Sequence, residues 1–227
     1  MEIVTQGILV LDKPRKISCA HLLNRMKPML PHKIKLGHAG TLDPLATGVL
    51  LVLIGRRATL RSMELMGQPK RYRATVRLGA TTPTLDMDTP EILEANPVRP
   101  TLEQVRAALP GFVGVIQQVP PIYCALKQGG RPLYAMARKG RPVQVTARPV
   151  QVYSIDLVAY QYPEIQIDVH CGRGTYIRSL ARDIAVALGT TGYLTSLCRT
   201  AVGLYTLEQA STYADLTAEN ICERLVN

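Results

Sequence analysis

The sequence predicts an α+β fold in which a mixed, mostly antiparallel sheet is flanked by helices and loops. Short apolar runs alternate with turn residues, one segment has strong helical periodicity, and the expected strands and helices follow each other without βαβ regularity. With 227 residues and 47% apolar side chains, the chain can bury a substantial core. Since no linker or internal repeat divides it, we expect residues 1–227 to form one domain.

The first expected elements are two buried strands, Gly7–Leu11 and Leu50–Ile54, because each is a short apolar run bounded by Asp, Pro or Gly. A basic, loop-rich stretch separates them. From Arg71 to Leu78 apolar and polar residues alternate, which places Tyr72 on the buried face of a third strand. The opposite face of that strand is cationic.

The middle of the chain carries a short helix and a hairpin. Thr101 followed by Gln104 is a capping-box signature, and the helix it opens should end before Pro110. Alternating residues then predict two strands, Pro149–Tyr160 and Glu164–Cys171, joined by a tight turn.

The longest predicted helix follows Gly174. Thr175 can cap its start and Gly189 can end it. Its apolar residues recur at helical spacing: Ile177, Leu180, Ala181, Ile184 and Leu188. The acidic last twenty residues suggest a closing helix around Ala218–Val226.

Charge points to a polyanionic partner. The formal net charge is +10 and the pI is near 9.6, which favours nucleic acid over an acidic membrane. Seven basic residues and one acid lie between residues 12 and 37, and six basic residues and no acid lie between 123 and 148. Either cluster alone could be a solvated loop. Together they favour contacts with phosphates.

Other features of the composition lead to expectations about the protein's location, its metal content and its oligomeric state. The longest apolar run is too short to span a membrane and no signal sequence opens the chain, so we expect a cytoplasmic protein. Five scattered cysteines and four histidines show no metal-ligand spacing, so we expect no metal and no cofactor. We expect a monomer, because the sequence contains no heptad repeat and no long exposed apolar helix that would indicate an interface.

Asp43 is the leading candidate for chemistry. An Asp-Pro pair by itself is usually a turn initiator. Here it lies in the run HAGTLDPLATGVL at residues 38–50, which resembles the active-site motif of the TruB family of tRNA pseudouridine synthases. Four further segments and the opening strand resemble that family in the right order: GILVLDKP at 7–14, KRYRATVRLG at 70–79, PPIYCALKQGGRPLYAMARKG at 120–140, CGRGTYIRSLARDI at 171–184 and LCRTAVG at 197–203.

The resemblance implies the pseudouridine synthase fold and the isomerisation of a uridine to pseudouridine in the T-loop of tRNA, at conventional position 55. Asp43 would be the nucleophile, because a carboxylate can attack the sugar C1′ or assist elimination there. Arg178 would pair with Asp43 and keep it ionised. Tyr72 would stack on the target base and place its hydroxyl near C5. Without the resemblance, Arg178 would be interpreted as a surface arginine and Tyr72 as a core tyrosine.

The resemblance also implies residues that bind the substrate. Tyr176 and Leu197 would line the base pocket, and Lys13 would be a structural lysine beside it. His38, otherwise a turn residue, would enter the RNA loop in place of the extruded base. A basic thumb segment at about residues 120–148 would grip the T-arm of tRNA.

The sequence departs from the family pattern in a few places. Only about two dozen residues follow LCRTAVG, too few for the family's usual C-terminal PUA-like RNA-binding domain. Cys198 replaces a common arginine, Arg173 a frequent lysine, and Pro83 interrupts an acidic loop. None of these belongs to the proposed catalytic set. Two alternatives stay open: the same reaction on another structured RNA, and a non-catalytic RNA-binding or folding protein.

Overall fold

The computed structural model describes residues 6–30, 34–140 and 145–226. The chain divides into two compact units. Unit 1 contains residues Met1–Arg73 and Leu197–Asn227, and unit 2 is the continuous segment Ala74–Ser196. The predicted single domain stays a prediction.

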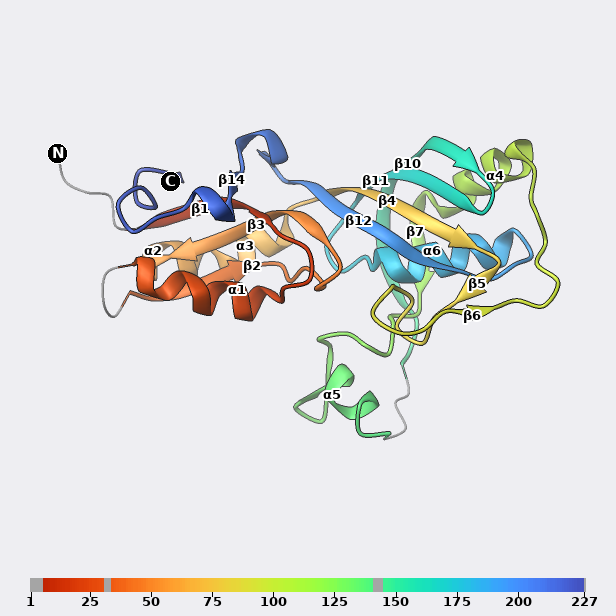
Figure 1. Cartoon of the computed structure of the whole chain (residues 1–227), viewed down its shortest axis with the longest axis horizontal. Coiled ribbons are helices and arrows are strands. Elements are labelled where there is room, and N and C mark those ends of the chain that lie inside the picture. The colour runs from red at the N-terminus through yellow and green to blue at the C-terminus, as the bar shows by residue number, and fades with distance from the viewer. Residues whose placement is uncertain (1–5, 31–33, 141–144, 227) are drawn as a thin grey trace. The chain divides into compact units, whose positions relative to one another are not determined.

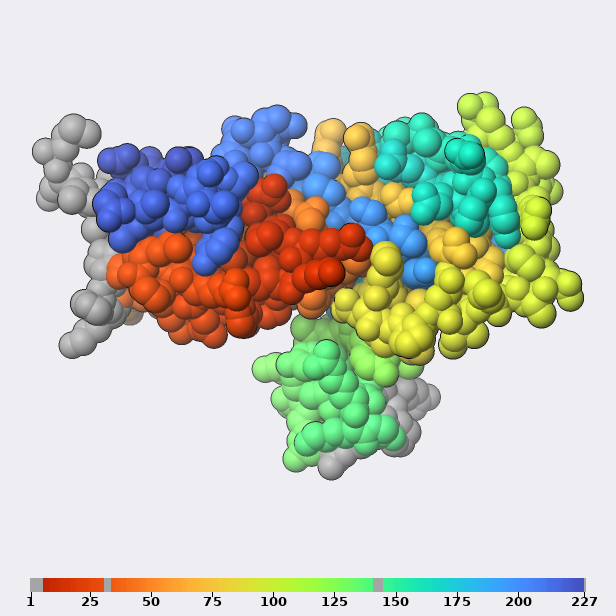
Figure 2. All heavy atoms as spheres, viewed as in Figure 1, coloured from red at the N-terminus to blue at the C-terminus, as the bar shows by residue number. Residues whose placement is uncertain are grey.

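Unit 1 is built around strands from both ends of the chain. Its strand order is β14-β1-β3-β12, with β15 beside β1, β2 beside β3 and β13 beside β12. The bounds are β1 Gly7–Lys13, β2 Leu36–Ala39, β3 Thr47–Ile54, β12 Gly192–Val202, β13 Tyr205–Thr206, β14 Ser211–Thr212 and β15 Leu225–Val226. Figure 2 shows the C-terminal segment, in dark blue, lying against the N-terminal segment, in red and orange.

The helices of unit 1 cover these strands. They are α1 Cys19–Met26, α2 Gly55–Leu60 and α3 Ser62–Gly67, with short 3-10 turns η1 Lys27–Met29, η3 Leu207–Gln209 and η4 Tyr213–Asp215. Alternate residues of β1 and β3 pack against α2 and α3 in one core cluster, in which Val10, Leu51 and Leu65 are buried (Figure 1). Both strands are buried along nearly their whole length, as their continuous apolar runs predict.

Unit 2 contains the strand order β12-β4-β11-β10-β7, in which β12 contributes its first half and β4 contributes its residues from Ala74 onward. Strand β10 pairs antiparallel with both β11 and β7. Its strands are β4 Lys70–Leu78, β5 Ala80–Thr81, β6 Ile92–Leu93, β7 Gly114–Gln118, β8 Lys127–Gln128, β9 Arg131–Pro132, β10 Arg148–Gln161 and β11 Glu164–Cys171. Its helices are α4 Leu102–Ala108, η2 Leu109–Phe112, α5 Leu133–Ala137 and α6 Ile177–Ala187.

Most expected elements are present. In β4, Tyr72, Ala74, Val76 and Leu78 are buried, and Arg71 and Arg73 are exposed, as the alternation predicts. The Thr101 capping box opens α4. Strands β10 and β11 form the predicted hairpin. Strand β1 pairs with β14 in parallel, and β3 pairs with β12 in parallel, so the mostly antiparallel sheet is mixed. This arrangement confirms the α+β class.

Three sequence predictions about elements are wrong. The stretch between the first two strands contains the helix α1, which was expected to be loop. Thr175 does not cap α6. Its hydroxyl donates instead to the Gly172 carbonyl, and Tyr176 is the N-cap residue. Residues 218–226 form turns and the strand β15 rather than a helix, because Leu225 and Val226 pair with β1.

Candidate active site

Asp43 lies in the connection between the paired strands β2 and β3 of unit 1. The connection turns sharply there, since the Ala46 amide donates to the Asp43 carbonyl at 3.1 Å. Asp43 itself is half-buried, whereas Leu42 and Leu45 on either side are buried. The two leucines anchor the loop in the core and leave the carboxylate partly accessible. We call residues 40–46 the Asp43 loop.

The Asp43 loop is held by side chains from distant parts of unit 1. The Cys19 sulfur accepts from the Leu42 amide at 3.3 Å and donates to the Leu42 carbonyl at 3.4 Å. The ammonium group of Lys13 donates to the Pro44 carbonyl at 3.4 Å, and the Lys16 amide donates to the same carbonyl at 2.8 Å. The residues on either side of Asp43 are therefore fixed through their backbone.

Arg199, from β12, braces both ends of the loop. It is 1% exposed, and its guanidinium donates to the Gly40 carbonyl at 3.0 Å and to the Val49 carbonyl at 2.7 Å. Gly48 makes this arrangement possible: its φ is +95°, and a Cβ there would lie 2.3 Å from the Arg199 carbonyl oxygen. Our sequence reasoning missed Arg199, although an arginine inside the apolar strand sequence LCRTAV is itself a signal.

The electrostatics of the Asp43 loop are dominated by two buried cations. Lys13 is fully buried, and burial lowers its pKa, while Cys19 and Asp43 act in the opposite direction. Burial raises the pKa of the Cys19 thiol, so this side chain stays a neutral hydrogen-bonding group. By the same attraction, the charge of Lys13 favours the ionised form of the Asp43 carboxylate.

Lys13 has the contacts of a structural lysine. Besides Pro44, its ammonium donates to the carbonyls of Pro14 at 2.8 Å and Ile17 at 2.9 Å. Three carbonyls thus accept from a group with three N–H donors. The lysine ties β1, the residues that follow it and the Asp43 loop together.

His38 lies in β2, two residues before the loop, and not in a turn. Its ring is half-buried, and no residue in the described parts of the chain hydrogen-bonds to its buried Nδ1 atom. Burial lowers the pKa of His38, and the nearby charge of Arg199 lowers it further. The imidazole is therefore held in its neutral form.

The other predicted site residues of unit 1 are Tyr72 and Leu197. Tyr72 is 9% exposed on the buried face of β4, and Leu197 is 7% exposed in β12. Their placement fits either core or pocket residues, so their predicted contacts with a base stay predictions.

Arg178 belongs to unit 2, in the first turn of α6, and is 4% exposed. It forms an ion pair with Asp86 at 3.5 Å and donates to the carbonyls of Thr84 at 2.8 Å and Tyr123 at 2.9 Å. The predicted pair with Asp43 of unit 1 stays a prediction. Asp86 was missed at the sequence level, because the acidic segment containing it was interpreted only as a loop.

Tyr176 precedes α6 in the same unit. Its amide donates to the Gln118 side chain at 2.8 Å, and the Arg148 guanidinium lies 5.2 Å from the centre of its ring. Burial and a hydrogen bond with Cys124 raise the pKa of Tyr176 to about 12. The phenol is therefore neutral at physiological pH and carries a hydroxyl hydrogen.

Among the residues that the structure describes, no group of three or more His, Cys, Asp or Glu side chains could hold a metal ion. No helix within those same residues is long and apolar enough to cross a bilayer.

Comparison with known proteins identifies what the chain resembles. Residues 27–177 match the family model described as TruB family pseudouridylate synthase, N-terminal domain. Over 94% of its length the chain is 46% identical to tRNA pseudouridine synthase B of Thiobacillus denitrificans and covers 71% of that protein. The tRNA pseudouridine synthase B of Ralstonia pickettii is 47% identical to this chain over 93% of the chain's length, and the chain covers 67% of that protein.

Two solved structures are similar to this chain over most of its length. A chain of a Cbf5-Nop10-Gar1 complex superposes over 94% of this chain with a TM-score of 0.73 and 27% identity. A chain of an H/ACA RNP bound to a substrate RNA containing 2′-deoxyuridine gives a TM-score of 0.70 and 26% identity. The present chain spans about half the length of each, 54% and 53%.

Proposed function

Because this chain belongs to the TruB family of pseudouridylate synthases, we propose that it converts uridine to pseudouridine in the T-loop of tRNA, at conventional position 55, with Asp43 as nucleophile. The proposal takes its substrate from the relatives, which are named tRNA pseudouridine synthase B. It takes its residue roles from the chemistry of the described side chains.

The reaction needs one carboxylate. The bond from uracil N1 to the sugar C1′ breaks, the base turns, and a bond forms between C5 and C1′. The C5 hydrogen then leaves as a proton and N1 gains one, so atoms balance and no electron is gained or lost overall. An ionised Asp43 attacks C1′ or assists elimination, and leaves again when the new bond forms.

The observation that carries the proposal is the way Asp43 is presented. A half-buried carboxylate is held in a loop whose backbone is bound by Lys13, Cys19 and Arg199, two of which are buried cations. A nucleophile needs this combination of fixed position, ionised state and partial access. A scaffold aspartate needs none of the three.

The remaining site residues have supporting roles in the proposal. Tyr72 stacks on the target uracil and brings its hydroxyl to C5, where the proton leaves. Arg178 orients the Asp43 carboxylate, while its ion pair with Asp86 and its bonds to two carbonyls fix the guanidinium. Tyr176 and Leu197 line the base pocket.

Extrusion of the uridine is assigned to His38. Its lowered pKa supplies a neutral aromatic ring, which can stack in the RNA loop at the position of the flipped base. Lys13 supports the site through its three carbonyl contacts and takes no chemical step.

The proposal includes one catalytic domain that acts as a monomer in the cytoplasm, without a cofactor. The basic segment at about residues 120–148 grips the T-arm through phosphate contacts. Of that segment, residues 141–144 lie outside the described residues. Within it, Arg148 donates to the Gly174 carbonyl at 2.8 Å and lies over the Tyr176 ring, so it links the segment to a proposed base-pocket residue of unit 2.

The first prediction concerns Asp43→Asn. Removing the nucleophile should lower tritium release from a T-arm hairpin containing 5-tritiated uridine by about a thousandfold or more. Hairpin affinity should change little, because the amide keeps the size of the carboxylate. The matched control is Asp156→Asn, the same change at an exposed position in β10, which should keep wild-type activity. An active Asp43→Asn variant would remove Asp43 from the role of nucleophile.

The substrate is tested separately from the chemistry. Pseudouridine mapping in RNA from a strain lacking this protein should show the loss of one modification, at tRNA position 55. Loss at another structured RNA would keep the reaction and change the substrate. An unchanged map would favour a non-catalytic RNA-binding protein.

A further inference from the structure

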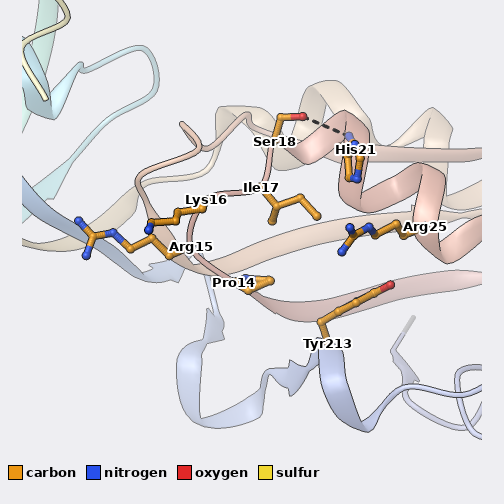
Figure 3. A pocket seen from close by; sticks show the side chains of 8 residues that line it. All are labelled: Pro14, Arg15, Lys16, Ile17, Ser18, His21, Arg25 and Tyr213. Carbon is orange, nitrogen blue, oxygen red and sulfur yellow. Dashed lines mark hydrogen bonds between the residues drawn. The ribbon is translucent and has the colours of Figure 1, made fainter. Parts of the chain in front are cut away.

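A polar pocket of about 400 Å³ lies in unit 1 between the end of β1, the start of α1 and the 3-10 turn η4. We call it the β1–α1 pocket (Figure 3). None of its residues belongs to the catalytic set proposed above. They are Pro14, Arg15, Lys16, Ile17, Ser18, His21, Arg25 and Tyr213.

The charge of the β1–α1 pocket is entirely positive. Its lining includes Arg15, Lys16 and Arg25 and contains no carboxylate. Within residues 6–30, 34–140 and 145–226, no acidic group forms an ion pair with Lys16 or Arg25. The carboxylate of Asp215, on the same 3-10 turn as Tyr213, accepts a hydrogen bond from Thr212. An anion in the pocket would therefore meet Lys16 and Arg25, whose charges no described carboxylate neutralises through an ion pair.

The start of α1 adds to this positive potential. Ser18 is the N-cap residue, and its Oγ accepts from the His21 amide at 3.2 Å. The Ser18 hydroxyl hydrogen remains able to donate. The positive end of the helix dipole lies at the same place, and the first turn of α1 has no acidic residue.

Lys16 is held in an unfavourable backbone conformation. Its φ is +65°, in the left-handed region that residues with a side chain rarely adopt. Glycine would fit this position without strain. The pocket is therefore lined by a lysine at a backbone position where glycine would be the unstrained residue.

The β1–α1 pocket is attached directly to the Asp43 loop. The Lys16 amide donates to the Pro44 carbonyl, and Lys13 joins that carbonyl to those of Pro14 and Ile17. A group bound in the pocket is thus fixed relative to the residue that follows Asp43. The pocket also has an apolar side, formed by Pro14, Ile17 and the half-buried ring of Tyr213.

We propose that the β1–α1 pocket binds a backbone phosphate of the RNA substrate, with Lys16 and Arg25 as its principal cationic contacts. The apolar side accommodates the adjoining sugar, and a volume of about 400 Å³ is suited to a nucleotide unit. In Figure 3, Arg15 and Lys16 extend from one end of the pocket while Arg25 and the Tyr213 hydroxyl lie at the other. A strand crossing the pocket can therefore meet a cation at either end. This inference rests on the proposed function, because it takes the RNA to be the substrate of Asp43.

The test compares RNA binding by Lys16→Gln, Arg25→Gln and the control Arg56→Gln. Arg56 is an exposed arginine of α2 outside the pocket. Each pocket variant should raise the Kd for the T-arm hairpin by about tenfold and lower the salt dependence of binding by about one counterion. Arg56→Gln should retain the wild-type Kd, salt slope and activity. Equal slopes for all three variants and the wild type would overturn the proposal.

A second measurement separates strain from charge. Lys16→Gly removes both the strain and the cation, so its melting temperature should equal or exceed that of the wild type while its RNA affinity falls as in Lys16→Gln. This result would show that weaker binding does not come from damaged folding. Full RNA affinity in Lys16→Gly would count against the proposal.

A third measurement identifies the source of the phosphate. The imidazole proton signals of His21 are assigned by their loss in His21→Gln and followed by NMR in two titrations at constant ionic strength, one with hairpin RNA and one with inorganic phosphate. Movement of the signals with the hairpin supports a backbone contact. Movement with inorganic phosphate alone would mean a free-anion site and overturn the proposal. If the wild type binds and isomerises the hairpin but its His21 signals do not move, the pocket proposal fails and the proposed function stands.

Discussion

At the scale of single residues, the position of Asp43 depends on side chains that bind the backbone around it. Arg199, Cys19 and Lys13 all bind backbone atoms of the loop or of its flanking residues. Lys13 is also a cation that interacts with the Asp43 carboxylate, so it both positions the loop and stabilises the negative charge there.

His38 gives a prediction about stability and pH. Burial and Arg199 lower its pKa below the ordinary value of 6.5, so below that pH the unfolded chain binds more protons than the folded chain. The stability that His38 contributes is complete above about pH 6.5 and is lost as the pH falls towards its folded pKa. Urea unfolding at pH 7.5 and 5.5 should show a smaller loss in His38→Gln than in the wild type.

The control for this prediction is His21→Gln, because His21 is exposed on α1. That variant should lose stability on acidification as the wild type does. Identical pH dependence in the wild type and His38→Gln would mean that the His38 ring is not disfavoured in its charged form.

The candidate site could be predicted only in part from the sequence. Asp43 and Arg178 became candidates through the motifs around them, and their roles stay predictions, whereas the alternation correctly placed Tyr72 on a buried face. Asp86 and Cys19 were not found, because a partner is visible in sequence only when a motif or a period links it to the site. Arg199 contacts Gly40 across 159 residues, and no local pattern connects the two.

At the scale of elements, strands were easier to predict than their surroundings. The apolar runs of β1 and β3 and the alternation of β4 fix their burial directly. The helix α1 also carries a helical pattern, with Cys19, Leu22, Leu23 and Met26 buried, but the basic composition of the stretch favoured a loop. Leu225 and Val226 form a strand because they pair with β1. This pairing is a tertiary contact, which local propensity does not report.

Gly48→Ala tests the close approach of β3 to β12. A Cβ at Gly48 would lie 2.3 Å from the carbonyl oxygen and 2.8 Å from the nitrogen of Arg199, at a φ of +95°. The strands would have to separate, so we expect a loss of about 2–4 kcal/mol in the free energy of unfolding. Tritium release should fall as well, because Arg199 would no longer brace the Asp43 loop. Urea unfolding followed by circular dichroism measures the first effect.

The matched change is Gly67→Ala at the end of α3, where an added Cβ would have no atom within 4 Å. It should leave stability unchanged or raise it by at most about 1 kcal/mol. Similar midpoints for Gly48→Ala and Gly67→Ala would show that the strands tolerate separation.

At the scale of the whole molecule, the proposed function predicts that RNA binding depends strongly on salt, because the excess of positive charge favours many phosphate contacts. The net charge is +10. Each phosphate neutralised contributes about 0.9 to the salt slope on a duplex, so contacts to only four phosphates lower affinity about a hundredfold between 50 and 200 mM salt. We expect at least this loss for the T-arm hairpin, measured by filter binding across that range.

The rate of the chemical step should respond to salt differently from the affinity for RNA. The single-turnover rate constant at saturating hairpin should change by less than about twofold over the same salt range, because the reaction at Asp43 releases no counterions. A salt-independent Kd would mean that phosphate contacts do not dominate binding, and the role of the basic segments would have to be abandoned.

The contact between Arg199 and Gly40 has a consequence for synthesis on the ribosome. The Asp43 loop is translated early, but the guanidinium that braces it follows 159 residues later. At about 5–20 residues per second, the nascent chain carries the Asp43 loop for roughly 8–30 seconds before Arg199 has been added. A half-made chain therefore contains the Asp43 loop without the side chain that holds its first residue, and under the proposed function it cannot yet modify RNA.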